Sequence, residues 1–135
     1  MPLRVLDTNL LVRYLTRDDQ EKAERALALL QRLERGEERA RSTVIVVFET
    51  VYTLQRYYKL PKPRIRELLV PIITLRGLQL PNKGLLVRTL DVYVGENISF
   101  ADAYHAADMA ARGETEIYSW DTDFDRIPGI TRVEP

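Results

Sequence analysis

Four acidic side chains stand where the expected backbone changes state, and they are the residues best suited to chemistry. Asp7 follows the first apolar run of the chain, and Asp121 follows a later one. Glu49 lies within a long apolar helix, and Asp102 opens another. A hydrophobic core gains nothing from carboxylates at such positions, whereas a hard cation such as Mg²⁺ takes oxygen ligands. Four acids that converged would therefore suit a divalent metal.

Each acid also has an interpretation that involves no metal. Asp7 could simply cap the helix after it, and Asp102 could complete a capping box that begins at Ser99. An exposed glutamate is common on a helix, but the apolar faces around Glu49 favour burial, and a buried carboxylate needs a partner or a metal. The acids from Asp121 onward could form only a solvated turn. The joint pattern favours a metal site, because all four alternatives would otherwise have to hold together.

Alternating strands and helices must position these acids. Short strands are expected at residues 3–6, 39–42, 78–80, 117–120 and 130–133. Helices are expected at residues 9–15, from 18 or 19 to 36, 44–58, from 63 onward, 82–96 and 100–112. This order predicts an α/β fold, a three-layer α/β/α sandwich with a mostly parallel central sheet. In such sheets ligands sit beyond the carboxyl ends of the strands, where Asp7 and Asp121 both lie.

Helix ends are marked by capping residues and prolines. Gly36 is a suitable stop, and Pro63 suits a first helical turn, whereas Pro71 should interrupt the helix that it enters. The β-branched run 44–47 is compatible with either a helix or a strand. Suitable N-cap side chains are Asp18 or Asp19, Thr43, Asn82 and Ser99.

The composition limits the class of protein. A length of 135 residues predicts a single domain over residues 1–135. The 20 basic and 20 acidic residues cancel, so nucleic-acid binding would have to come from local patches. The absence of cysteine excludes disulfides and thiolate metal sites. The start lacks a signal-peptide pattern and no apolar run reaches about 18 residues, so we expect a cytoplasmic protein without membrane contact.

The motifs around the four acids resemble those of PIN-domain ribonucleases. They are, in chain order, residues 5–9 (VLDTN), 48–49 (FE), 99–103 (SFADA) with the alanines at 106 and 107, 119–124 (SWDTDF) and 127–130 (IPGI). Trp120 departs from the usual phenylalanine but remains apolar. The resemblance extends over essentially the whole chain, and the small single-domain form is most similar to VapC-like toxins of VapBC-type toxin–antitoxin pairs.

The resemblance implies a metal-dependent endoribonuclease that leaves a 5′-phosphate and a 3′-hydroxyl. One or two Mg²⁺ or Mn²⁺ ions would be held by the four catalytic acids, Asp7, Glu49, Asp102 and Asp121, with Asp123 as a supporting ligand. The residues that would orient ligands or water are Thr8, Asn9 and Ser119. His105, near Asp102 on the same helix, is a weaker candidate for a general base, because a metal-bound hydroxide needs none.

Partners are also implied. Candidates for contacts to RNA phosphates are Arg13, Arg17, Arg56 and Lys59, although a solvated basic face is the simpler alternative. The resemblance implies the toxin component of a type II toxin–antitoxin system, a homodimer, and a cognate antitoxin that blocks the acidic pocket, often with an arginine. The apolar segment 65–80 could provide the dimer interface, or could be core.

Two other functions remain open. A PIN fold without activity could serve as a binding module. A haloacid-dehalogenase-type phosphatase would also place an aspartate after the first strand, at Asp7. That class needs a second aspartate two residues later, where this chain has Asn9, and it gives Glu49 no role.

Overall fold

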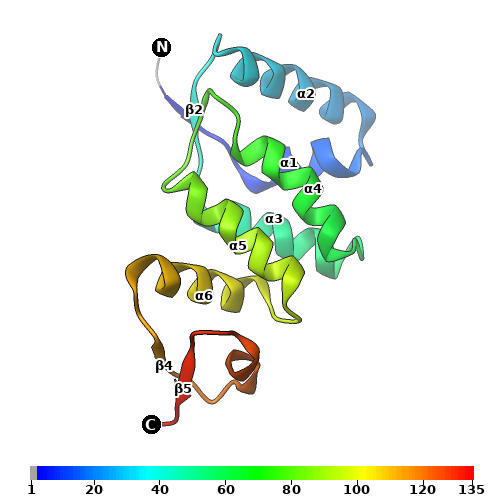
Figure 1. Ribbon diagram of the computed structural model, residues 1–135. Coiled ribbons are helices and arrows are strands. Elements are labelled where there is room, and N and C mark those ends of the chain that lie inside the picture. Colours follow the sequence, from blue (N-terminus) through cyan, green and yellow to red (C-terminus); the bar gives the residue numbers. More distant parts are fainter. Residues whose placement is uncertain (1–2) are drawn as a thin grey trace. The chain divides into compact units, whose positions relative to one another are not determined.

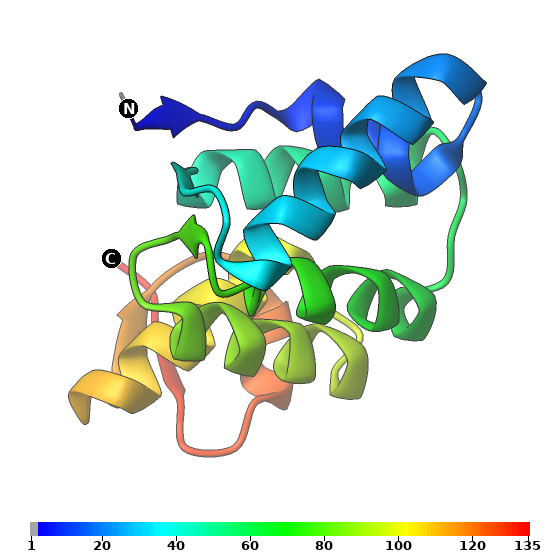
Figure 2. The ribbon, with the colours of Figure 1, turned by 90° about the horizontal axis from the view of Figure 1, so that it is seen from above.

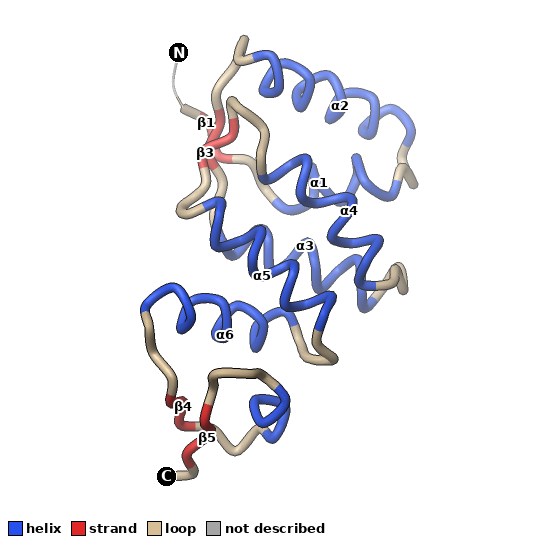
Figure 3. The backbone as a smooth tube through the Cα atoms, viewed as in Figure 1, coloured by secondary structure: helices blue, strands red, loops and turns tan. Residues whose placement is uncertain are grey.

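The computed structural model describes residues 3–135, which form two compact units (Figure 1). The first unit ends at Lys83 and the second begins at Gly84. Helices account for most of the ordered backbone, and the strands are short (Figure 3).

The first unit contains a three-stranded parallel sheet in the order β1-β2-β3. Arg4 pairs with Ala40, and Ala40 pairs with Leu78. Beyond β1, the Leu6 amide donates to the Arg41 carbonyl at 2.8 Å, so the pairing continues to the residue before Asp7. The elements are β1 Arg4–Val5, α1 Thr8–Thr16, α2 Gln20–Arg35, β2 Ala40–Arg41, α3 Val44–Arg56, α4 Lys62–Ile73 and β3 Leu78–Gln79.

The helices of the first unit pack on one another as their apolar stripes predict. α1 packs against both α2 and α3, and α3 packs against α4 (Figure 2). Leu33, Leu54 and Ile65 are fully buried. In the segment 65–80, the buried apolar side chains are Ile65, Leu69, Ile72, Ile73 and Leu78. Half or more of the large apolar side chains of this segment therefore belong to the core, as the second of the two interpretations expected.

The second unit contains a two-stranded parallel sheet and two long helices. β4 and β5 pair with Ile117 opposite Arg132, and the ladder is extended by a hydrogen bond that the Thr131 amide donates to the Thr115 carbonyl at 2.7 Å. Tyr93 and Phe100 pack edge to face at 5.5 Å between ring centres. The elements are α5 Lys83–Gly95, α6 Phe100–Arg112, β4 Glu116–Tyr118, the 3₁₀ helix η1 Thr122–Arg126 and β5 Thr131–Val133.

Most predicted helix ends are confirmed at atomic detail. Thr43 accepts from the Val46 amide, which makes the β-branched run 44–47 helical rather than a strand. Asp19 is the N-cap of α2. Gly36 and Gly113 end their helices with φ of +74° and +72°, a conformation that glycine adopts without steric cost.

Three local details differ from what the sequence predicted. Pro71 does not interrupt α4, since the helix continues past it to Ile73. α3 ends at Arg56, two residues before the expected end near residue 58. β4 ends at Tyr118, before Trp120, and the acidic stretch after it forms η1 rather than only a solvated turn.

The α/β class with parallel strands is confirmed, since all three strand pairings are parallel and helices separate the strands. This order is consistent with the expected α/β/α sandwich. Across residues 3–135, the longest apolar helical stretches fall short of what a membrane crossing requires.

Candidate metal centre

Three carboxylates gather in the second unit, and we call Asp102, Asp121 and Asp123 the acidic trio. Each offers one oxygen, and these oxygens all lie within 4.8 Å of one another. Asp102 comes from the first turn of α6, while Asp121 is the N-cap of η1 and Asp123 lies in the first turn of η1. Two separate elements therefore bring oxygen ligands to one point.

Local hydrogen bonds hold the backbone around each member of the trio. The Ser99 hydroxyl accepts from the Asp102 amide at 3.1 Å as the N-cap of α6. The Ser119 hydroxyl accepts from the Asp121 amide at 2.9 Å, and Asp121 Oδ1 accepts from the Asp123 amide at 2.9 Å. These short-range bonds begin η1 and fix the positions from which the carboxylates project.

Electrostatics in the trio favour a bound cation or proton. Partial burial raises the pKa of Asp102, and a hydrogen bond with Asp121 raises it further. The negative charges of Asp121 and Asp123 act in the same direction, while the Ser99 hydrogen bond opposes them. Clustered carboxylates resist full ionisation unless a positive charge is present. A divalent cation would relieve this repulsion, and an all-oxygen donor set suits Mg²⁺ or Mn²⁺.

One positive charge comes from an arginine that was not among the predicted site residues. Arg126 donates to Asp123 Oδ1 at 2.7 Å and to the Asn97 carbonyl at 2.7 Å. It therefore ties a member of the trio to the connection between α5 and α6. The position of Arg126, three residues after Asp123 in a helical turn, was the available signal.

A hollow of about 500 Å³ lies beside two members of the trio. Asp102, His105 and Asp121 line it together with Tyr118. The ring of His105 also contacts Phe124 edge to face, with 6.3 Å between the ring centres. The hollow gives a substrate or water access to the acids.

The first unit holds the other two acids. Asp7 is exposed at the N-cap position of α1, and within the described chain its side chain makes no capping hydrogen bond to that helix. Thr8 Oγ1 donates to Glu49 Oε2 at 3.2 Å, which links the start of α1 to α3. Glu49 is exposed, so the expected burial of this side chain was wrong.

The candidate phosphate-binding residues also lie in the first unit. Arg13 forms an ion pair with Asp18 at 3.0 Å. The Arg17 guanidinium lies 5.6 Å from the ring centre of Tyr14, within cation–π range. Arg56 and Lys59 are both exposed near the end of α3.

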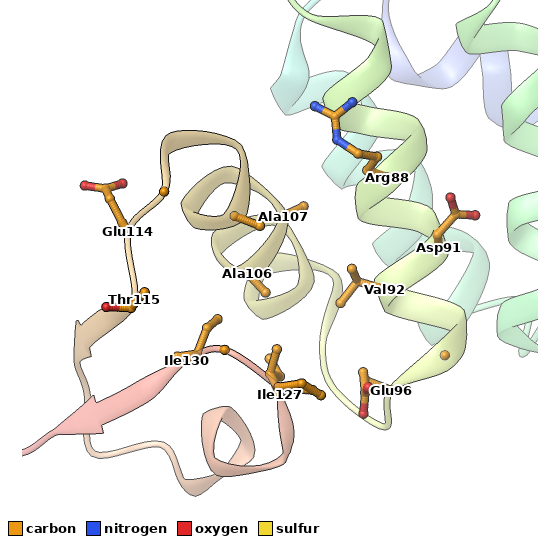
Figure 4. A pocket seen from close by; sticks show the side chains of 15 residues that line it. Arg88, Asp91, Val92, Glu96, Ala106, Ala107, Glu114, Thr115, Ile127 and Ile130 are labelled. Carbon is orange, nitrogen blue, oxygen red and sulfur yellow. The ribbon is translucent and has the colours of Figure 1, made fainter.

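Another cavity of the second unit lies away from the trio (Figure 4). It measures about 600 Å³, and no member of the trio lines it. Its wall is largely apolar, including Ala106, Ala107, Ile127 and Ile130, with Arg88 among its few charged residues. Among the described residues, the acids close enough together to hold a metal ion are those of the trio, so the candidate centre remains there.

Comparison with known proteins agrees with the geometry. The PIN domain family matches residues 4–130, a span that includes Asp7, Glu49 and the whole acidic trio. No curated protein matches the chain. Family membership indicates nuclease chemistry in general and is typical of proteins that use a divalent metal. Because the match covers nearly the whole sequence, the chain belongs to the PIN-domain family.

Proposed function

We propose that this protein is a metal-dependent endoribonuclease that hydrolyses RNA phosphodiester bonds with Mg²⁺ or Mn²⁺. The observation that carries the proposal is the acidic trio, three carboxylate oxygens within 4.8 Å of one another in a PIN-family chain. Asp7 and Glu49 would complete the ligand set and, with Asp102 and Asp121, form the catalytic acids.

The chain's own residues would hold and orient the reacting groups. An ion bound by these acids would supply the activated water and stabilise the leaving oxygen. Thr8 would keep Glu49 oriented through their 3.2 Å hydrogen bond. Ser119 would fix the backbone of Asp121, and Asn9, which follows Asp7 and Thr8 in the chain, would orient water or a ligand.

Cleavage of a labelled single-stranded RNA tests the proposal. Wild type with Mg²⁺ should give products with a 5′-phosphate and a 3′-hydroxyl, and a chelator should abolish cleavage. Asp102→Asn should reduce the cleavage rate at least about a hundredfold. Asp91 is an exposed acid on α5, and Asp91→Asn should keep the wild-type rate. Metal-independent cleavage, or equal loss in both variants, would argue against the proposal. Intact RNA with metal bound would instead indicate the inactive binding module.

We further propose that the protein acts as the toxin of a type II toxin–antitoxin pair in the cytoplasm. An acidic centre suits an inhibitory arginine from a cognate antitoxin, because guanidinium groups bind carboxylates strongly. Arrest of bacterial growth on induction, abolished in Asp102→Asn, would support this role. A homodimer is part of the same proposal, and light scattering of the purified chain would test it.

A further inference from the structure

Positively charged side chains gather in a groove between α1 and α2, although the chain as a whole has no net charge. It measures about 520 Å³. Four cationic side chains line it and no acidic residue does, although the whole chain carries zero net charge. We call it the basic groove, and its lining residues are Asn9, Leu10, Arg13, Lys22, Arg25, Ala26, Leu29 and Arg32.

The basic groove continues to one of the candidate catalytic acids. A second hollow of about 330 Å³ contains Asp7 in its lining. The two hollows share Asn9, Leu10, Leu29 and Arg32, so they form one path along the first unit. A chain molecule with a phosphate at Asp7 could therefore extend directly into the positively charged part.

Two of the four cations are only loosely held by protein carboxylates. Lys22 lies 3.9 Å from Asp19 and Arg25 lies 4.0 Å from Glu21, with 61% and 79% of their side chains exposed. Exposed pairs of this kind contribute little to stability, and a phosphate can replace the carboxylate without a large loss.

The other two cations are held in place. Arg13 bonds to Asp18 at 3.0 Å, and Arg32 bonds to Glu38 at 3.1 Å. Lys22 and Arg32 are ten positions apart in α2, which corresponds to about 15 Å along the helix. The groove is thus long enough for several nucleotides of an extended strand.

We propose that the basic groove binds the phosphodiester backbone of single-stranded RNA next to a cleavage site at Asp7. The inference rests on the proposed nuclease function and assigns Lys22, Arg25 and Arg32 to substrate binding. Phosphate contacts position the strand without reading its bases, so RNA binding in the groove does not depend on the base sequence. Four cations and no acidic side chain in the lining favour a polyanion, and an acidic peptide of a partner is the competing occupant that the test must separate.

The test compares the double variant Lys22→Gln/Arg25→Gln with Arg64→Gln/Arg66→Gln, which removes the same charge from α4. The substrates are a single-stranded RNA of twelve nucleotides and a dinucleotide too short to enter the groove. We expect the KM of the groove variant for the long RNA to rise about tenfold, with a much smaller change for the dinucleotide. The salt slope of log kcat/KM should fall by about 0.7 for each RNA phosphate that the variant no longer neutralises.

The proposal is overturned if the two double variants behave alike, or if the long and the short substrate are affected equally. It is also overturned if the groove variant loses affinity for an acidic peptide but keeps its affinity for RNA. If wild type cleaves neither substrate, the nuclease function fails. Fluorescence anisotropy with the twelve-nucleotide RNA then shows whether the basic groove binds RNA. Weaker RNA binding of the groove variant alone would support it.

Discussion

Asp121→Asn should make the metal-free protein more stable and the metal-bound protein less stable. In the absence of metal, the carboxylate oxygens of the trio lie within 4.8 Å of one another. Two unit charges at that distance repel by about 0.9 kcal/mol in water and by about 3.5 kcal/mol at an effective dielectric constant of about 20. Because Asp121 is exposed, the lower value applies, and we expect a gain of about 1 kcal/mol. The asparagine keeps the oxygen that accepts from the Asp123 amide.

Mg²⁺ should reverse the order of stability, so that wild type becomes more stable than Asp121→Asn. A ligand that binds only the folded state stabilises it by about 2.7 kcal/mol when its free concentration is about 100 times Kd. Wild type should gain that amount, whereas Asp121→Asn loses a charged ligand and should gain much less. The stabilities of the two proteins should therefore cross as Mg²⁺ is added.

The pH dependence adds a second signature. The raised pKa of Asp102 means that the folded state holds this proton more tightly than the unfolded chain, whose value is near 3.8. Its contribution to stability is complete below pH 3.8 and is lost as the pH rises through the raised value. Metal-free wild type should lose stability over that range, and Asp121→Asn should lose less.

Urea denaturation at low salt, in chelator and in saturating Mg²⁺, measures all three effects. Asp91→Asn controls for the change in net charge. Repulsion within the trio is refuted as the cause if Asp121→Asn is the less stable protein in chelator, and a shared metal site is refuted if Mg²⁺ stabilises both proteins equally.

Three further perturbations have defined outcomes. Arg126→Gln should bind Mn²⁺ several-fold more tightly by calorimetry, because the guanidinium competes for a carboxylate of the trio and repels a dication. Gly77→Ala should destabilise the protein by about 2 kcal/mol, since a Cβ there would meet two backbone carbonyl oxygens, one at 2.7 Å, while Gly95→Ala, with open space, should be neutral or stabilising. Tyr58→Phe should raise the pKa of Asp18 toward 3.8 in an NMR titration, because the tyrosine hydroxyl is the main cause of its lowering. The part of the acid-side loss of stability that Asp18 causes, which begins as the pH falls through 3.8, should then be smaller than in wild type.

Local signals made most of the fold predictable. The N-caps Thr43 and Ser99 and the stop at Gly36 act through bonds within a few residues, so the sequence alone determines them. Glu49 was wrongly expected to be buried because α3 exposes apolar side chains as well. Ile45 is 66% exposed and Tyr52 59%, so apolar neighbours in sequence did not imply a buried face.

Features that depend on tertiary packing were not predictable. Arg126 bonds to the Asn97 carbonyl, 29 positions away in the chain, and nothing in the sequence indicates this second contact. The basic groove forms only because α1 packs against α2, which places Arg13 beside Lys22 and Arg25. In the sequence, the nearby acids Asp18 and Asp19 make the same stretch look electrically balanced.

A crystal of the protein soaked in Mn²⁺ and measured at the manganese absorption edge tests the central claim most directly. The anomalous map should contain a peak at Asp102, Asp121 and Asp123, with manganese–oxygen distances of about 2.0–2.3 Å, and Asp7 and Glu49 should approach the same ion or its neighbour. A map without a peak at these three carboxylates, or with manganese bound only elsewhere, would contradict the account.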